Sequence, residues 1–280
     1  MTPSVHATLP QAFFLPTGGR NCFCLFHPTH HEAGRGGVLY LHPLAEELNS
    51  TRRVVAQQAR ALARAGFSVL QIDLSGCGDS DGHFEDATWE GWLQDARQAH
   101  RWLRERATGP LCLWGTRAGA LLAVALANDV AEPCDFLFWQ PAVDGHQLLQ
   151  QFLRLHTASQ WLGPGQANAR RPAEMLARGE SVDVAGYTLS AALARGMAAA
   201  RLHPTPQYKG RLVWLEMSVQ AEPVLGLASK QCLNLWSEAG WAISAQAVTG
   251  PSFWQTVTSD DAPALLRTTL ELQTSDTSTP

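Results

Sequence analysis

Short apolar runs alternate along the chain with longer segments in which apolar residues recur at helical spacing. The runs predict eight strands, at 11–15, 21–27, 36–43, 67–74, 111–115, 134–141, 211–218 and 242–250. The helical spacing predicts helices at 50–65, 89–106, 118–128, 227–239 and about 260–272. The first two strands flank two glycines and are expected to form a hairpin. The other six alternate with helices, which predicts an α/β protein with a mostly parallel sheet and helices on both faces.

One segment interrupts this alternation. Between the strands at 134–141 and 211–218 the connection is too long for a simple crossover. It contains Leu- and Ala-rich helical stretches at 146–155, 173–178 and 189–200, broken by GPGQANARRP. We therefore expect a sheet core at 1–143 and 210–272, a helical cap insertion at 144–209 over the sheet edge where ligands bind, and a disordered tail at 273–280.

The stretch LCLWGTRAG, residues 111–119, has the form of a catalytic turn with an unusual residue at its centre. A strand ends in Gly115-Thr116-Arg117-Ala118-Gly119 and leads directly into a helix, as in the G-x-S-x-G nucleophile elbow. Arg117 occupies the position of the nucleophile. Because a guanidinium stays protonated at physiological pH, Arg117 cannot attack a substrate.

The base and the acid of a Ser-His-Asp triad are also missing or doubtful. The base is expected after the last strand, but all ten histidines lie at or before His203, and that loop reads GPSFW. Phe253 and Trp254 in this loop either fill the vacated space or line a ligand pocket. The carboxylates nearest the usual position of the acid are Glu216 and Glu222. We therefore expect no catalytic residue.

An active enzyme stays open as the alternative. An esterase or thioesterase would need a nonstandard nucleophile, for which the nearby candidates are Ser75, Cys77 and Ser80. His42 or His83 would then serve as the base.

The loop after the strand at 36–43 reads HPLAEE, residues 42–47. Serine hydrolases commonly have glycine where Pro43 stands, and proline has no N–H to offer an oxyanion. Glu46 and Glu47 would oppose the negative charge that hydrolysis builds up, but they attract Arg117. In one interpretation Glu46 or Glu47 forms an ion pair with Arg117 that tethers the loop. In the other, Arg117 at a helix N-terminus binds a ligand carboxylate or phosphate. The candidate ligand-binding residues are Arg117, Thr116, His42, Leu44, Glu46, Glu47 and Trp254.

Composition narrows the possible partners. A net charge of −4 and a pI of about 6.2 provide no basic surface for nucleic acid or anionic membranes. The N-terminus lacks the features of a signal peptide, and no run approaches the length of a membrane span, so we expect a cytoplasmic protein. Six cysteines in apolar runs predict buried structural thiols. The acidic sequence at 79–81 is typical of a turn, and no nucleotide-binding glycine motif occurs, so we expect no metal and no cofactor.

The order of the elements resembles the α/β-hydrolase fold over nearly the whole chain. More narrowly, the chain resembles the second type of exosortase A system-associated hydrolase in HPLAEELNSTRR, QIDLSGCGDSDG, ATWEGWLQDA, LWGTRAG, FWQPAVDG, QFLRL, VAGYTLS and GPSFWQT. The resemblance implies a role beside bacterial exopolysaccharide synthesis and the sorting of proteins with the PEP-CTERM signal. Since fold alone does not fix function, the degenerate triad favours a non-catalytic binder of a small anionic or acyl ligand, or of a partner such as the first-type hydrolase of that system.

Overall fold

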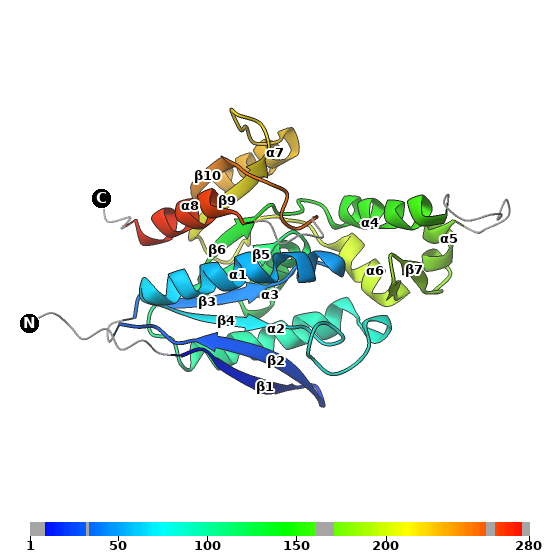
Figure 1. The fold of residues 1–280 in the computed structure, drawn as a ribbon, viewed down its shortest axis with the longest axis horizontal. Coiled ribbons are helices and arrows are strands. Elements are labelled where there is room, and N and C mark those ends of the chain that lie inside the picture. The colour runs from blue at the N-terminus through cyan, green and yellow to red at the C-terminus, as the bar shows by residue number, and fades with distance from the viewer. Residues whose placement is uncertain (1–8, 32–33, 161–170, 256–260, 276–280) are drawn as a thin grey trace, which may run out of the picture.

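The computed structural model describes residues 9–31, 34–160, 171–255 and 261–275. Its eight-stranded sheet has the order β1-β2-β4-β3-β5-β6-β9-β10 (Figure 1). The strands are β1 (Gln11–Thr17), β2 (Arg20–His27), β3 (Gly36–Leu41), β4 (Phe67–Ile72), β5 (Leu111–Thr116), β6 (Cys134–Trp139), β9 (Arg211–Ser218) and β10 (Ala242–Thr249). Strand β2 runs antiparallel to β1 and to β4, and all other neighbours are parallel. The predicted hairpin and mostly parallel sheet are confirmed.

Helices cover both faces of this sheet, as predicted. Side chains of α1 (Glu46–Arg64) and α8 (Pro263–Thr274) join the core on one face. Side chains of α2 (Trp89–Arg104), α3 (Ala118–Val130) and α7 (Leu227–Glu238) join the core on the other. Because both faces are covered, β3 and β5 are buried along their whole length, and their sequences are largely apolar.

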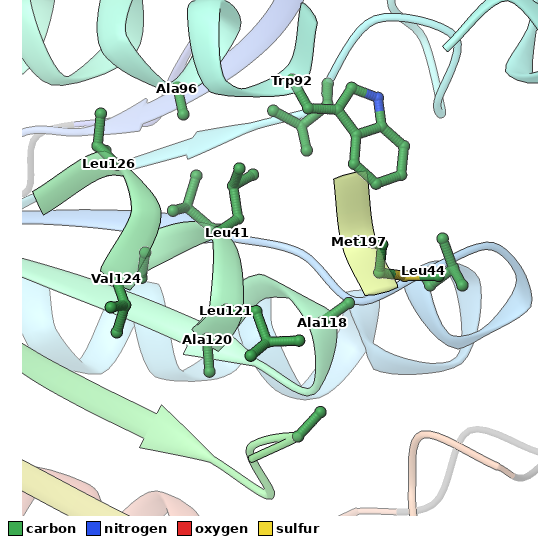
Figure 2. Close-up of a cluster of buried hydrophobic side chains, with 14 of the residues drawn as sticks. Leu41, Leu44, Trp92, Ala96, Ala118, Ala120, Leu121, Val124, Leu126 and Met197 are labelled. Carbon is green, nitrogen blue, oxygen red and sulfur yellow. The ribbon is translucent and has the colours of Figure 1, made fainter. Parts of the chain in front are cut away.

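Helix α3 lies at the centre of the molecule. Its sequence AGALLAVALANDV is apolar on all sides until its last turn, as expected for a helix with no solvent face. Figure 2 shows its side chains gathered with Leu41 of β3 and Trp92 of α2. Leu44 and Met197 belong to the same buried cluster, at the end where α3 begins. The start of α3 is therefore held on several sides by core packing.

Helix α1 begins earlier than predicted, at Glu46 instead of residue 50. Glu46 and Glu47 thus lie in its first turn, where a negative charge is favourable beside the free N–H groups and the positive end of the helix dipole. The preceding residue, Ala45, has a positive φ of 50°. The two acidic side chains therefore project from a helix end and not from a loop.

The insertion lies beyond the carboxyl ends of the parallel strands (Figure 1). It consists of α4 (Gly145–Gln160), α5 (Pro172–Ala177), β7 (Val182–Val184), β8 (Tyr187–Leu189) and α6 (Ala191–Ala199), and we call it the cap. At its base, Asp144 and Arg201 form an isolated β-bridge and an ion pair of 3.1 Å. The predicted helical cap also contains the short hairpin of β7 and β8, in which Ala185 and Gly186, both with positive φ, make the turn, so the helix predicted at 189–200 begins only at Ala191. Most of GPGQANARRP lies outside the described residues.

The C-terminal helix extends beyond the predicted boundary at residue 272. Gln273 and Thr274 still belong to α8, and the Arg35 Nη2 donates to the Thr274 carbonyl over 2.9 Å. The predicted tail is therefore wrong at its first two residues, and 276–280 lie outside the described part. All six cysteines are buried free thiols, as predicted. Among the described helices, none combines the length and apolar character that crossing a bilayer requires.

Candidate functional site

A cleft of about 300 Å³ lies where the carboxyl edge of the sheet meets the cap. Its polar side chains include those of Glu46, Glu47, Arg117 and Gln151. Its apolar walls include Leu44, Leu148, Phe152 and Trp254. The cleft therefore combines one guanidinium with an apolar lining, and its volume is at the small end of the range typical of ligand pockets.

The turn that carries Arg117 has the backbone of a nucleophile elbow. Arg117 adopts φ 53° and ψ −113°, a conformation that side-chain-bearing residues rarely occupy, between β5 and α3. The glycines on either side are required by close approaches. A Cβ on Gly119 would lie 2.0 Å from the Leu41 carbonyl oxygen, and one on Gly115 would lie 2.5 Å from Ala120. The G-x-x-x-G spacing thus allows the tight strand-to-helix turn, whichever residue stands at its centre.

The Arg117 side chain is directed into the cleft and contacts three of its walls. Its Nε donates to Glu47 Oε1 over 3.1 Å, and its Nη2 donates to Gln151 Oε1 over 3.3 Å. Its guanidinium carbon lies 6.0 Å from the centre of the Trp254 ring, at the limit of a cation–π contact. Arg117 therefore links the first turn of α1, the cap helix α4 and the loop after β10.

The expected ion pair is made by Glu47 and not by Glu46. Glu47 Oε2 is buried and has no hydrogen-bond partner among the described residues. Burial raises the pKa of the Glu47 carboxyl, although the Arg117 charge opposes that shift. Glu46 is exposed and instead accepts a hydrogen bond of 3.0 Å from the Tyr187 hydroxyl of the cap. The two neighbouring carboxylates thus face different partners.

The structure brings five of the seven predicted ligand-binding residues to the cleft and leaves two out. Thr116 is fully buried at the end of β5, beneath the turn, and does not line the cleft. His42 is also buried: its Nδ1 donates to the Pro43 carbonyl over 2.7 Å, and its Nε2 accepts from the Leu74 N–H over 3.2 Å. Burial lowers the pKa of His42, so the neutral ring serves as a cross-link between two loops. The prediction was wrong in placing these two side chains in the pocket.

Among the described residues, the positions expected for the base and the acid of a triad hold other structural elements. Phe253 is fully buried against Trp139, and Trp254 lines the cleft, so aromatic rings occupy the loop where the base would stand. Glu216 accepts from Trp214 Nε1 and from the Gly226 N–H, which fixes the loop between β9 and α7. No histidine is found among the described residues that line the cleft.

The alternative nucleophiles also lie away from the cleft. Ser75 is buried, with its Oγ 3.6 Å from the Cys22 sulfur. Ser80 donates to the Asp73 carbonyl and accepts from the Phe23 N–H. Burial raises the pKa of the Cys77 thiol, the opposite of what activates a nucleophilic cysteine. His83, the second candidate base, is exposed at the surface.

The acidic loop is a structural turn, as predicted. Asp73 Oδ2 accepts from Arg52 Nη2 over 2.8 Å and from the Asp79 N–H over 3.1 Å. Asp81 accepts from the backbone and the side chain of Asn21. Within the described ranges, no three side chains of His, Cys, Asp or Glu are grouped as a metal site would require.

Sequence reasoning placed the cap over the ligand-binding edge but did not identify which of its residues line the cleft. Leu148, Gln151 and Phe152 line the cleft from one face of α4. Their spacing of three and four residues places them together on a helix, and this was the signal available in the sequence. Nothing in that spacing indicated that this face would lie over the elbow.

Comparison with known proteins shows which protein family this chain is related to. The family described as serine aminopeptidase, S33, matches residues 34–185, which is more than half of the chain. Human protein ABHD12B is 31% identical over 126 residues, covering 45% of this chain and 33% of that protein. The thermostable monoacylglycerol lipase of Bacillus sp. (strain H-257) is 28% identical over 117 residues, covering 42% of this chain and 45% of the lipase. The chain thus spans less than half the length of either relative.

Solved structures show the same fold. Est1E from Butyrivibrio proteoclasticus, solved with ferulic acid, superposes with a TM-score of 0.66 at 14% identity and covers 94% of this chain and 96% of its own. XC6422 from Xanthomonas campestris, described as an α/β serine hydrolase without a lid, gives a TM-score of 0.55 at 17% identity, with 96% and 95% covered. The predicted α/β-hydrolase fold is confirmed.

Proposed function

Because the chain belongs to the serine aminopeptidase S33 family of α/β-hydrolases, we propose that it is a non-hydrolytic member that binds a small anionic or acyl ligand in the cleft. One observation carries the proposal: Arg117 stands at the nucleophile position of an elbow whose strained backbone is intact. Strained turns cluster at functional sites, because only the surrounding structure can maintain them. A guanidinium at this position can bind an anion but cannot attack a carbonyl carbon.

The surroundings of Arg117 support binding without hydrolysis. Acyl transfer needs a base within hydrogen-bond reach of the nucleophile, and the cleft offers Trp254 in that loop instead. The apolar walls formed by Leu44, Leu148 and Phe152 suit an acyl chain. The similarity to the thermostable monoacylglycerol lipase of Bacillus sp., an enzyme named for an acylated substrate, supports an acyl ligand for this cleft.

The proposal extends to the cellular setting. The sequence motifs resemble the second type of exosortase A system-associated hydrolase, so we place the protein in the cytoplasm, beside exopolysaccharide synthesis and PEP-CTERM protein sorting. The first-type hydrolase of that system is then the candidate partner. Size-exclusion chromatography of the two purified proteins, alone and mixed, tests this pairing: co-elution supports it, and separate elution contradicts it.

Labelling and turnover experiments test the absence of hydrolysis. We expect the purified protein neither to react with a fluorophosphonate probe nor to cleave p-nitrophenyl esters faster than a heat-denatured sample. Labelling that disappears in Ser75→Ala or Ser80→Ala, or turnover that disappears in Cys77→Ala, would show an active enzyme and overturn the proposal.

Titration calorimetry tests the binding role with octanoate as the probe. Arg117→Ala should weaken binding by more than about tenfold, because a charge-assisted hydrogen bond to the ligand is lost. Arg106→Ala is the matched control, since Arg106 is an exposed arginine that follows the C-terminal end of α2. Tight binding that is indifferent to Arg117→Ala would exclude the cleft as the binding site.

A further inference from the structure

The cleft already contains a carboxylate, and it belongs to the protein. Glu47 lies in the first turn of α1, and Arg117 stands directly before the first turn of α3. The positive ends of both helix dipoles favour negative charge in this region. The Glu47 carboxylate therefore sits where the carboxylate of a ligand would be bound.

The contact between Glu47 and Arg117 is incomplete on the acidic side. Only Oε1 of Glu47 accepts from Arg117, whereas Oε2 is buried without a partner among the described residues. An arginine and a carboxylate in their strongest arrangement share two parallel hydrogen bonds. The pair therefore leaves one carboxylate oxygen unsatisfied, which weakens the hold of Glu47 on Arg117.

The contact is incomplete on the basic side as well. A guanidinium has five N–H donors. Among the described residues, only Glu47 and Gln151 accept from the Arg117 guanidinium, and the Gln151 contact is long at 3.3 Å. The end of the guanidinium formed by Nη1 and Nη2 thus keeps donors for a further acceptor.

The charges around the cleft disfavour a ligand with two negative charges. Arg117 is the one cation among the described residues that line it, while Glu46 and Glu47 contribute two carboxylates. A phosphate dianion would bring a second charge into this surrounding and be repelled. A carboxylate brings one charge and can pair with both Nη atoms.

The volume of the cleft limits the size of the rest of the ligand, and the lining of the cleft limits its polarity. A cleft of about 300 Å³ has room for roughly ten non-hydrogen atoms, the size of octanoate, at about 30 Å³ for each water-sized group. Leu148, Phe152 and Trp254 give it an apolar lining. A short hydrocarbon tail is therefore favoured over a sugar or a nucleotide.

We propose that the cleft takes a monocarboxylate with a short apolar tail, and that the ligand carboxylate displaces Glu47 from Arg117. This inference rests on the proposed function and names the ligand class and the internal competitor of the same site. Removing the negative charge of Glu47 should then strengthen ligand binding, although a contact of Arg117 is lost.

Titration calorimetry at pH 7.5 with octanoate, octyl phosphate and methyl octanoate tests the inference. The variants are Glu47→Gln, Arg117→Ala and the control Glu105→Gln. Glu105 is exposed after the C-terminal end of α2, so Glu105→Gln changes the net charge equally without touching the cleft. Circular dichroism and thermal unfolding establish that each variant is folded.

We expect the wild-type protein to bind octanoate more tightly than octyl phosphate or methyl octanoate. Glu47→Gln should strengthen octanoate binding by about two- to fivefold, the range of an ion pair that is partly open to solvent. Arg117→Ala should weaken it, and Glu105→Gln should leave it unchanged.

Other outcomes separate this inference from the proposed function. If Glu47→Gln weakens octanoate binding or leaves it unchanged, Glu47 is not a competitor, and the inference fails while the binding role stands. If octyl phosphate or methyl octanoate binds best and still depends on Arg117, the ligand class is wrong. If none of the three probes binds to wild-type protein or to Glu47→Gln, the proposed function itself fails.

Discussion

Two arginine–carboxylate pairs lie at the carboxyl end of the sheet, and their surroundings differ. Asp73, directly after β4, accepts from Arg52 at 2.8 Å and from the Asp79 N–H, and its side chain is only 8% exposed. Glu47 accepts from Arg117 at 3.1 Å through one oxygen, and its side chain is 22% exposed. The Asp73 carboxylate is enclosed in a turn, where one oxygen accepts two hydrogen bonds, whereas the Glu47 carboxylate faces the cleft and its Oε2 has no partner among the described residues.

The difference separates a structural ion pair from a binding surface. Asp73 is held by a residue only six positions away in the chain, and Gly78, with φ 54°, leaves the space that Asp73 Oδ2 needs. Arg117 and Glu47 are far apart in sequence and meet at a strained turn. Two hydrogen bonds to one Asp73 oxygen stabilise the turn after β4, whereas unsatisfied donors at a strained backbone retain capacity for a ligand.

Substitution of Asp73 should have the largest effect on stability. We expect Asp73→Ala to lower the free energy of unfolding by about 3 kcal/mol, because it removes a buried carboxylate and leaves its donors unpaired. Urea unfolding measures the loss. Asp79→Ala is the control, since Asp79 contributes its backbone N–H, which the substitution retains. A loss below about 1 kcal/mol in Asp73→Ala would show that this pair is no more structural than a surface pair.

Backbone strain at the elbow should appear as a difference in stability between two variants that shorten the Arg117 side chain. Both Arg117→Gly and Arg117→Ala remove the guanidinium, but only glycine accepts φ 53° without strain. We expect the glycine variant to be more stable than the alanine variant by about 1 kcal/mol, the reverse of the order at ordinary positions. Chemical denaturation of both proteins measures the difference. Equal stabilities, or a more stable alanine variant, would mean that the turn is not strained.

Of the three changes, the titration of Glu47 should have the smallest effect on the free energy of unfolding. Its pKa is raised in the folded protein above the ordinary value of 4.5, so the folded state binds a proton more readily than the unfolded state. The stability contribution is therefore fully present below pH 4.5 and is lost as the pH rises through the folded pKa. Relative to wild type, Glu47→Gln should therefore gain unfolding free energy as the pH rises through that range. Urea midpoints at several pH values measure the gain, and a gap that narrows with rising pH would contradict the assignment.

Most of the architecture could be predicted because apolar runs and helical spacing report burial directly. The strand at 211–218 was predicted with its observed bounds, and other strands differ by one or two residues at their ends. Errors arose where tertiary contacts decided the outcome. Leu189 lies in a spacing that favours a helix, yet it pairs with Val182 in the cap hairpin. Gln273, predicted in a disordered tail, is buried in α8.

The sequence by itself determined that the chain folds as an α/β-hydrolase with Arg117 in place of a nucleophile and no imidazole after the last strand. These properties follow from residue identity and local spacing, which do not depend on distant contacts. Only the tertiary structure decided that Glu47 and not Glu46 meets Arg117, that His42 and Thr116 are withdrawn from the cleft, and that Gln151 joins it. The reason is geometric: neighbouring side chains in a helical turn point in directions about 100° apart, so the packing of α1 and the cap selects which side chain enters the cleft.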